Sequence, residues 1–208
     1  MRIPVACEVI PVRFPAGMLR SFLARALLAG FSLVAGAAVA FAMPAEIILL
    51  SHAEKPPTGS ELNDDGRKRA DALAGLFATD PRVRAHGPVA AIFAMIPSDK
   101  NGSVRAIQTM EPTAAALHLK IDTRFTRDEF KALAKAIRKD KSLDGKTVVI
   151  CWEHKVIPAI VSALGWPNPP TQWLDGVYDR LWILDFEQDV PVAFHDLPQR
   201  LLPGDTGK

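Results

Sequence analysis

Two histidines stand just after predicted buried strands, at the points where those strands end. His52 follows the apolar run 47–50 by one serine, and His154 follows the β-branched run 147–152. In an open parallel sheet, ligands bind in the crevice beyond the carboxyl ends of the strands. An imidazole in that place can act as a nucleophile, a general acid or base, or a metal ligand. For each histidine taken alone, the alternative is a residue that merely caps a strand.

Arg105 is the third candidate, because it lies near the start of a helix expected after the strand 89–95. If the strands before His52 and His154 are neighbours, both imidazoles emerge at one edge of the sheet and Arg105 joins them there. Two imidazoles, a guanidinium and nearby helix N-termini form a small basic pocket that suits a phosphoryl group.

Alternating strands and helices must position these side chains. Strands are expected over 46–50, 89–95, 147–152, 180–186 and 190–194. Several of these runs are continuously apolar, which is typical of strands covered by helices on both faces. The pattern predicts one three-layer α/β/α domain with a mostly parallel central sheet.

Helices are expected between the strands, each with an apolar face. Asn63 and Ser103 are candidate N-caps for the first two helices. Pro112 is expected to kink or restart the second helix, because proline removes a backbone donor. A third helix is expected over 127–138, and a fourth begins just after His154.

Residues 1–42 have the composition of an extension and a secretory signal peptide. Arg20 and Arg25 precede the apolar stretch 26–42, which closes with an Ala-x-Ala cleavage pattern at 40–42. The alternative is an uncleaved membrane anchor. We expect a mature domain over 43–208, exported to the periplasm or the medium, with no membrane contact after cleavage. The start residue, Met1 or Met18, is not decided by this pattern.

Composition narrows the classes of partner. The hydrophobic fraction of 49% and charged fraction of 23% are those of an ordinary globular protein. A net charge of +2 without a Lys/Arg cluster does not favour nucleic-acid binding. No phosphate loop, dinucleotide fingerprint or zinc-ligand spacing is present, so no cofactor and no metal are expected. The oligomeric state is not indicated.

The remaining thiol and imidazoles are assigned structural or exposed roles. Cys151 would be the one cysteine of the mature chain, and its apolar surroundings favour a small buried hydrophobe over a nucleophile. His86, His118 and His195 lie in connections or at element ends, where a structural or exposed role is commoner than a catalytic one.

Five segments, in order, resemble motifs of the histidine phosphatase superfamily, also called phosphoglycerate-mutase-like. They are Ser-His-Ala-Glu-Lys at 51–55, the helix entry 62–70, Ser-Val-Arg-Ala-Ile-Gln-Thr at 103–109, the strand 148–154 and the late strand 178–182. The resemblance spans essentially the whole expected mature chain and implies a phosphoglycerate-mutase-like fold. It implies that His52 attacks phosphorus and becomes phosphohistidine, while His154 and Arg105 hold the phosphoryl oxygens.

The resemblance also suggests roles for neighbouring charges. Asp128 or Glu129 stands where the family often places its proton donor, although a solvated helix N-terminus explains either residue as well. Glu54 and Glu153 each adjoin a proposed catalytic histidine. They are expected either to support the imidazoles without contacting the phosphoryl group or to lie on the surface. Lys55 is expected either to contact an anionic substrate at the rim or to remain a solvated loop charge.

Ser51 is the main departure from the family pattern, which normally has an arginine at this position. A hydroxyl supplies one neutral hydrogen bond in place of a forked, charged pair of donors. Loss of such a contact costs roughly 2–5 kcal/mol. Lys100 could replace the missing charge in part.

Two hypotheses therefore stand. The first is an exported phosphohydrolase, possessing a phosphohistidine intermediate, that acts on a small phosphomonoester or a phosphoprotein side chain. The second is a catalytically impaired pseudoenzyme that binds a phosphorylated or other anionic ligand. A mutase is less favoured, because few insertions are present to form a lid that excludes water.

Overall fold

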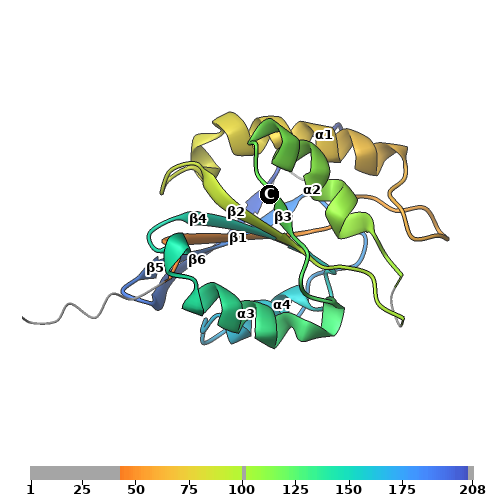
Figure 1. The fold of residues 1–208 in the computed structure, drawn as a ribbon. Helices are drawn as coiled ribbons and strands as arrows, with labels where there is room; N and C mark the ends of the chain where they lie inside the picture. The colour runs from red at the N-terminus through yellow and green to blue at the C-terminus, as the bar shows by residue number, and fades with distance from the viewer. Residues whose placement is uncertain (1–42, 100–101, 206–208) are drawn as a thin grey trace, which may run out of the picture. The chain divides into compact units, whose positions relative to one another are not determined.

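The computed structural model describes residues 43–99 and 102–205 (Figure 1). The proposed signal peptide, its cleavage site, Met18 and Lys100 lie outside the described residues. Within the described ranges, no helix has both the length and the apolar character needed to cross a membrane.

A six-stranded sheet with the order β3-β2-β4-β1-β5-β6 forms the centre of the fold. The strands are β1 (Glu46–Ser51), β2 (Val89–Ala94), β3 (Ile121–Asp122), β4 (Thr147–Trp152), β5 (Arg180–Glu187) and β6 (Val190–Pro198). Parallel pairs join β1 to β4, β4 to β2 and β2 to β3, whereas β5 is antiparallel to both β1 and β6. The predicted mostly parallel sheet is confirmed. The two-residue strand β3 was not predicted, because so short a segment has no readable period.

Helices cover both faces of this sheet. They are α1 (Asp64–Thr79), α2 (Arg105–Ala116), α3 (Phe130–Lys139) and α4 (Ile157–Ala163), with 3-10 turns η1 (Pro81–Val83), η2 (Arg127–Glu129) and η3 (Lys141–Leu143). Figure 1 shows α1 and α2 over one face and α3 and α4 over the other. All residues of β1 and β4 are buried between the layers. The predicted three-layer α/β/α architecture is confirmed.

Of the two predicted helix N-caps, one is confirmed and the other is not. The Asn63 side chain caps α1 by accepting a hydrogen bond from the Gly66 backbone N–H at 2.8 Å. The prediction for Ser103 was wrong: Val104 is the N-cap of α2 and makes no side-chain cap bond. Ser103 lies one residue further out, and its hydroxyl accepts a long 3.4 Å bond from the Arg105 N–H.

Pro112 lies inside α2, and the helix runs through it, so the structure excludes the predicted restart. The proline removes one backbone donor from the helix. Packing of α2 against α1 and the sheet explains why the helix nevertheless continues to Ala116, since tertiary contacts override local propensity. The site residues on the first turn of α2 therefore belong to one continuous helix of 12 residues.

Gly66 brings α1 into close contact with the loop that follows β1. A Cβ placed on Gly66 would lie 2.3 Å from the backbone oxygen of Glu54, and the Asn63 N–H donates to that same oxygen at 3.1 Å. The start of α1 thus sets the path of the chain just after His52.

We expect Gly66→Ala to lower the free energy of unfolding by ~1–3 kcal/mol, because backbone atoms must move apart to admit the methyl group. Urea denaturation measures this change. Gly75→Ala is the matched control, since Gly75 is exposed in the same helix and its Cβ would meet nothing within 4 Å. The control should gain ~0.5–1 kcal/mol from helix propensity, and equal effects in both variants would contradict the argument.

Candidate functional site

The pairing of β1 with β4 brings the two predicted histidines to one edge of the sheet. Ser51 is opposite Trp152 in the parallel register, and the His52 N–H donates to the Trp152 carbonyl at 3.1 Å. His154 follows Trp152 by two residues, in the turn before α4. Both imidazoles therefore leave the sheet at the carboxyl ends of its two central strands, where ligands bind in such folds.

His52 is buried, with 2% of its surface exposed. Its Nδ1–H donates to the Ala53 carbonyl at 2.7 Å, since a carbonyl can only accept. In the neutral ring this leaves the lone pair on Nε2. Burial lowers the pKa of His52 to about 4, and the positive charges of Arg105 and Lys55 act in the same direction. His52 is therefore unprotonated at neutral pH, which is the form a nucleophile needs.

Side chains from α2 hold the loop that carries His52. Thr109 Oγ1 accepts a 2.9 Å bond from the Ala53 N–H, and its own hydroxyl donates to the Arg105 carbonyl at 2.8 Å. The preceding residue also takes part, since Gln108 Oε1 accepts from the Leu62 N–H at 2.9 Å. These bonds connect the end of β1 to the helix that bears Arg105.

His154 is also buried, with 5% of its surface exposed. Its Nε2 has no hydrogen-bond partner among the described residues, and the closest carboxylate oxygen, Asp175 Oδ1, is 3.6 Å away. Burial lowers the pKa of His154, against the opposing charges of Glu153 and Asp175. A buried imidazole nitrogen without a partner is costly, so His154 is suited to contact a ligand.

Arg105 lies at the start of α2, where backbone carbonyls hold its guanidinium. Nε donates to the Glu61 carbonyl at 3.0 Å, Nη2 donates to the Gly59 carbonyl, and Nη1 donates to the Ser103 hydroxyl at 3.3 Å. None of these partners is charged. Because its charge lowers the pKa of His52, Arg105 is within electrostatic reach of that imidazole.

Lys55 and Ser51 flank His52 in different ways. The charge of Lys55 lowers the pKa of both His52 and His154, so this lysine is electrostatically near both rings. Ser51 is 1% exposed, and its Oγ has no hydrogen-bond partner within the described ranges. The strand end therefore has a buried, unpaired hydroxyl at the position where the family pattern has an arginine.

The predicted carboxylates are engaged by arginines or by backbone. Glu54 pairs with Arg69 at 2.7 Å, and Glu153 pairs with Arg127. Neither carboxylate forms a hydrogen bond with an imidazole. Both therefore neighbour the histidines in the chain without bonding to their rings.

The two candidate proton donors lie at η2. Asp128 pairs with Arg127 at 2.6 Å and is exposed. Glu129 completes a capping box with Thr126, and hydrogen bonds from the Thr126 backbone and hydroxyl lower the pKa of Glu129. That bonding favours the ionised carboxylate, which is not a proton donor.

Cys151 is fully buried in β4, and burial raises the pKa of its thiol. It therefore does not form the thiolate that a nucleophile requires. In the part of the chain that the structure describes, no group of three or more His, Cys, Asp or Glu side chains could hold a metal ion.

Sequence reasoning missed three residues around the site. The Tyr178 ring centroid lies 6.0 Å from that of His52, Asp175 approaches His154, and Arg69 is buried beneath Glu54. Arg69 had a detectable signal, because it shares the buried face of α1 with Ala70 and Leu73. A charged residue on such a face must be paired.

Comparisons with known proteins agree with this fold. No family model matches the chain, and no curated protein matches it. Among solved structures, the protein histidine phosphatase SixA complexed with tungstate has a TM-score of 0.53 at 11% identity, covering 74% of this chain and 97% of its own. Phosphoglycerate mutase from Bacillus anthracis str. Sterne has a TM-score of 0.50 at 12% identity, covering 74% and 92%. At such identities the similarity shows the phosphoglycerate-mutase-like fold alone.

We expect the folded protein to lose stability as pH falls from about 6.5 to 4, because burial holds the pKa of His52 near 4 in the native state. In this window the unfolded chain binds the proton and the native imidazole does not, so acid favours unfolding. The contribution from His52 is on the order of 3 kcal/mol.

Urea denaturation at a series of pH values measures this dependence in wild type and in His52→Gln. The substitution should flatten the slope between pH 6.5 and 4, whereas His118→Asn, at the far end of α2, should not. Parallel curves for wild type and His52→Gln would show that the native imidazole titrates normally.

Proposed function

We propose that this protein is an exported phosphohydrolase of the histidine phosphatase superfamily. It acts on a phosphomonoester or a phosphorylated protein side chain through a phosphohistidine at His52. The observation that carries the proposal is the state of His52: its Nδ1–H is bound to the Ala53 carbonyl, so the unprotonated Nε2 is available at the sheet edge shared with His154.

In this mechanism the Nε2 lone pair of His52 attacks phosphorus as the bond to the leaving oxygen breaks. The leaving oxygen takes a proton and departs as an alcohol. Water then attacks the phosphohistidine, which releases inorganic phosphate and restores the imidazole. Asp128 is retained as the donor of the leaving-group proton, for which it would first leave its exposed ion pair with Arg127 and take up a proton from solvent, whereas Glu129 is committed to the capping box.

Positive and hydrogen-bonding groups around His52 support phosphoryl binding. His154 Nε2 is buried without a partner, and the guanidinium of Arg105 is held by neutral groups. Among described residues, neither Arg105 nor Lys55 forms an ion pair with a carboxylate. These groups would hold the equatorial oxygens, where charge builds up in the transition state.

Ser51 favours a second candidate function, a pseudoenzyme that binds a phosphorylated or other anionic ligand. A serine at this position removes two charged donors from the site, while the other ligand-binding groups are retained. Binding would then survive with little or no turnover. Export remains part of the proposal on the strength of the leader pattern in residues 1–42.

The mature domain is expected to hydrolyse a chromogenic aryl phosphate, and His52→Ala should reduce the rate to background, because the covalent intermediate cannot form. Acid quenching during turnover should trap an acid-labile phosphoenzyme only when His52 is present. His118→Asn is the control and should retain wild-type activity. Turnover that persists in His52→Ala would exclude the phosphohistidine mechanism, whereas phosphate binding without turnover in wild type would favour the pseudoenzyme.

Ser51→Arg should raise kcat/KM by about tenfold or more, because a charge-assisted, forked contact is restored to the phosphoryl group. Steady-state kinetics with the same aryl phosphate measures the change, after circular dichroism has established that the variant is folded. Ser51→Met is the control of similar length without the charge. A rate for Ser51→Arg at or below that of Ser51→Met would show that position 51 is not the missing phosphate contact.

A further inference from the structure

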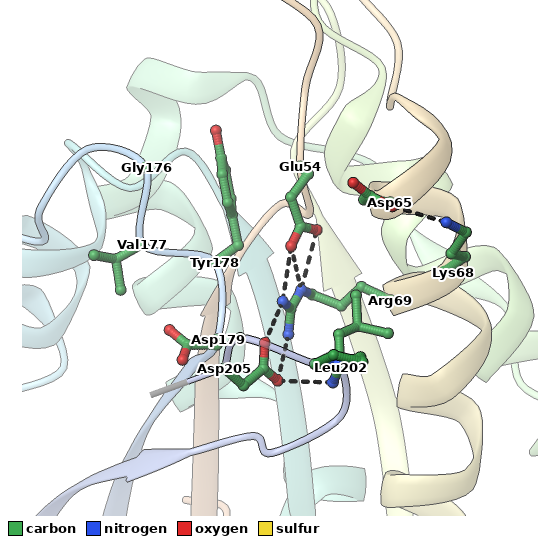
Figure 2. A pocket seen from close by; sticks show the side chains of 12 residues that line it. Glu54, Asp65, Lys68, Arg69, Gly176, Val177, Tyr178, Asp179, Leu202 and Asp205 are labelled. Carbon is green, nitrogen blue, oxygen red and sulfur yellow. Dashed lines mark hydrogen bonds and ion pairs between the residues drawn. The ribbon is translucent and has the colours of Figure 1, made fainter. Parts of the chain in front are cut away.

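Arg69 is the most heavily bonded charged side chain near the site, and the proposed reaction does not use it. It is 3% exposed on the inner face of α1. Its Nη2 donates to Glu54 and to Asp205, each at 2.7 Å, and its Nε donates to both Glu54 carboxylate oxygens at 3.0 Å. Nη1 donates to Asp205 at 3.1 Å and to Gln199 at 3.0 Å. Figure 2 shows the guanidinium between the two carboxylates.

This network joins three parts of the chain that are far apart in sequence. Glu54 belongs to the loop after β1, Arg69 to α1, and Asp205 to the turn 201–205. Asp205 Oδ2 also accepts from the backbone N–H groups of Leu201 and Leu202, at 2.7 and 3.1 Å. One guanidinium therefore holds the C-terminal turn against the loop that carries the nucleophile.

The position of Glu54 matters for an anionic ligand. Its carboxylate is only two residues from His52, and a carboxylate that turned toward a bound phosphoryl dianion would repel it. The ion pair with Arg69 gives this carboxylate a fixed partner, and the Glu54 backbone is held independently by Asn63.

The same network forms one side of a cavity of about 500 Å³. Its lining includes Glu54, Arg69, Tyr178 and the turn residues Leu202 and Asp205 (Figure 2). Tyr178 connects this cavity to the nucleophile, because its ring centroid is 6.0 Å from that of His52. His52 itself does not line the cavity; Tyr178 is the lining side chain whose ring lies near the imidazole, and the turn that Arg69 holds in place bounds the cavity.

We propose that Arg69 is a positioning residue with two separate effects. Through Glu54 it keeps a negative charge out of the phosphoryl site, and through Asp205 it holds the turn 201–205 as a wall of the cavity that receives the leaving group. Both effects rest on the phosphoryl site of the proposed function, but only the second also needs turnover, because phosphate binding can be measured without it.

Titration calorimetry with inorganic phosphate tests the Glu54 effect on the whole mature domain. Arg69→Met keeps an apolar stem but frees Glu54, and we expect it to weaken phosphate binding by about tenfold or more. The double variant Arg69→Met with Glu54→Gln should recover most of that loss, since the freed charge is gone. Arg67→Met is the matched control, because Arg67 is exposed on the same helix and its ion pair is with the exposed Glu61.

Two results would overturn this first effect: equal phosphate affinity in Arg69→Met and Arg67→Met, or no recovery in the double variant. If Arg69→Met does not fold, Arg69→Gln replaces it, with and without Glu54→Gln. A glutamine keeps a hydrogen-bonding side chain at this buried position but has no charge to pair with Glu54. The same recovery by Glu54→Gln is then expected, and its absence again overturns the assignment.

Asp205→Asn tests the second effect, because it removes the charge that pairs the C-terminal turn with Arg69, while the amide oxygen can still accept from the Leu201 and Leu202 N–H groups. It should leave phosphate affinity unchanged while altering KM severalfold for a bulky naphthyl phosphate relative to a small alkyl phosphate. An equal change for both esters, or weakened phosphate binding, would overturn the role of the turn as a wall. If the wild type shows no turnover at all, the hydrolase proposal is contradicted. The effect of Arg69 through Glu54 is still decided by the calorimetric measurement of phosphate binding, which needs no turnover.

Discussion

The site depends on the parallel pairing of β1 with β4. Their register sets Ser51 beside Trp152, and the bond from the His52 N–H to the Trp152 carbonyl extends that pairing by one residue beyond the strand. A shift of one residue would turn a side chain to the opposite face of the sheet. Both strands are buried on both faces, so such a shift would exchange side chains of different size and shape between two packed layers and is strongly opposed. The same apolar packing that stabilises the core therefore brings two imidazoles to one edge.

Charge is distributed unevenly around that edge. Near the imidazoles, Arg105 is held by neutral backbone carbonyls, whereas Glu54 and Glu153 are each bound by a separate arginine. Burial disfavours the protonated form of both histidines. This arrangement keeps the rings neutral and leaves positive charge free to meet an anion. It is the electrostatic pattern expected of a phosphoryl site, although Ser51 contributes less to it than an arginine would.

The fold was largely predictable because its signals are local and periodic. Continuous apolar runs indicated the strands, and the Asn63 cap marked the start of α1. The errors came where packing overrides local chemistry. Pro112 is tolerated because α2 is held by α1 and the sheet, and β3 escaped notice because two residues show no period. The Ser103 cap was misplaced by one residue, which is a common uncertainty at helix ends.

The sequence by itself determined the order of the elements and the types of the candidate residues, including His52, His154 and Arg105. Only the tertiary structure decided what each charge does. Glu54 and Arg69 are 15 positions apart and Asp205 is 136 positions beyond Arg69, so no local pattern relates them. Ion pairs form between side chains that folding brings together, and burial strengthens them by removing water. For that reason the residues of the candidate site were readable from the chain, whereas the network that holds them in place was not.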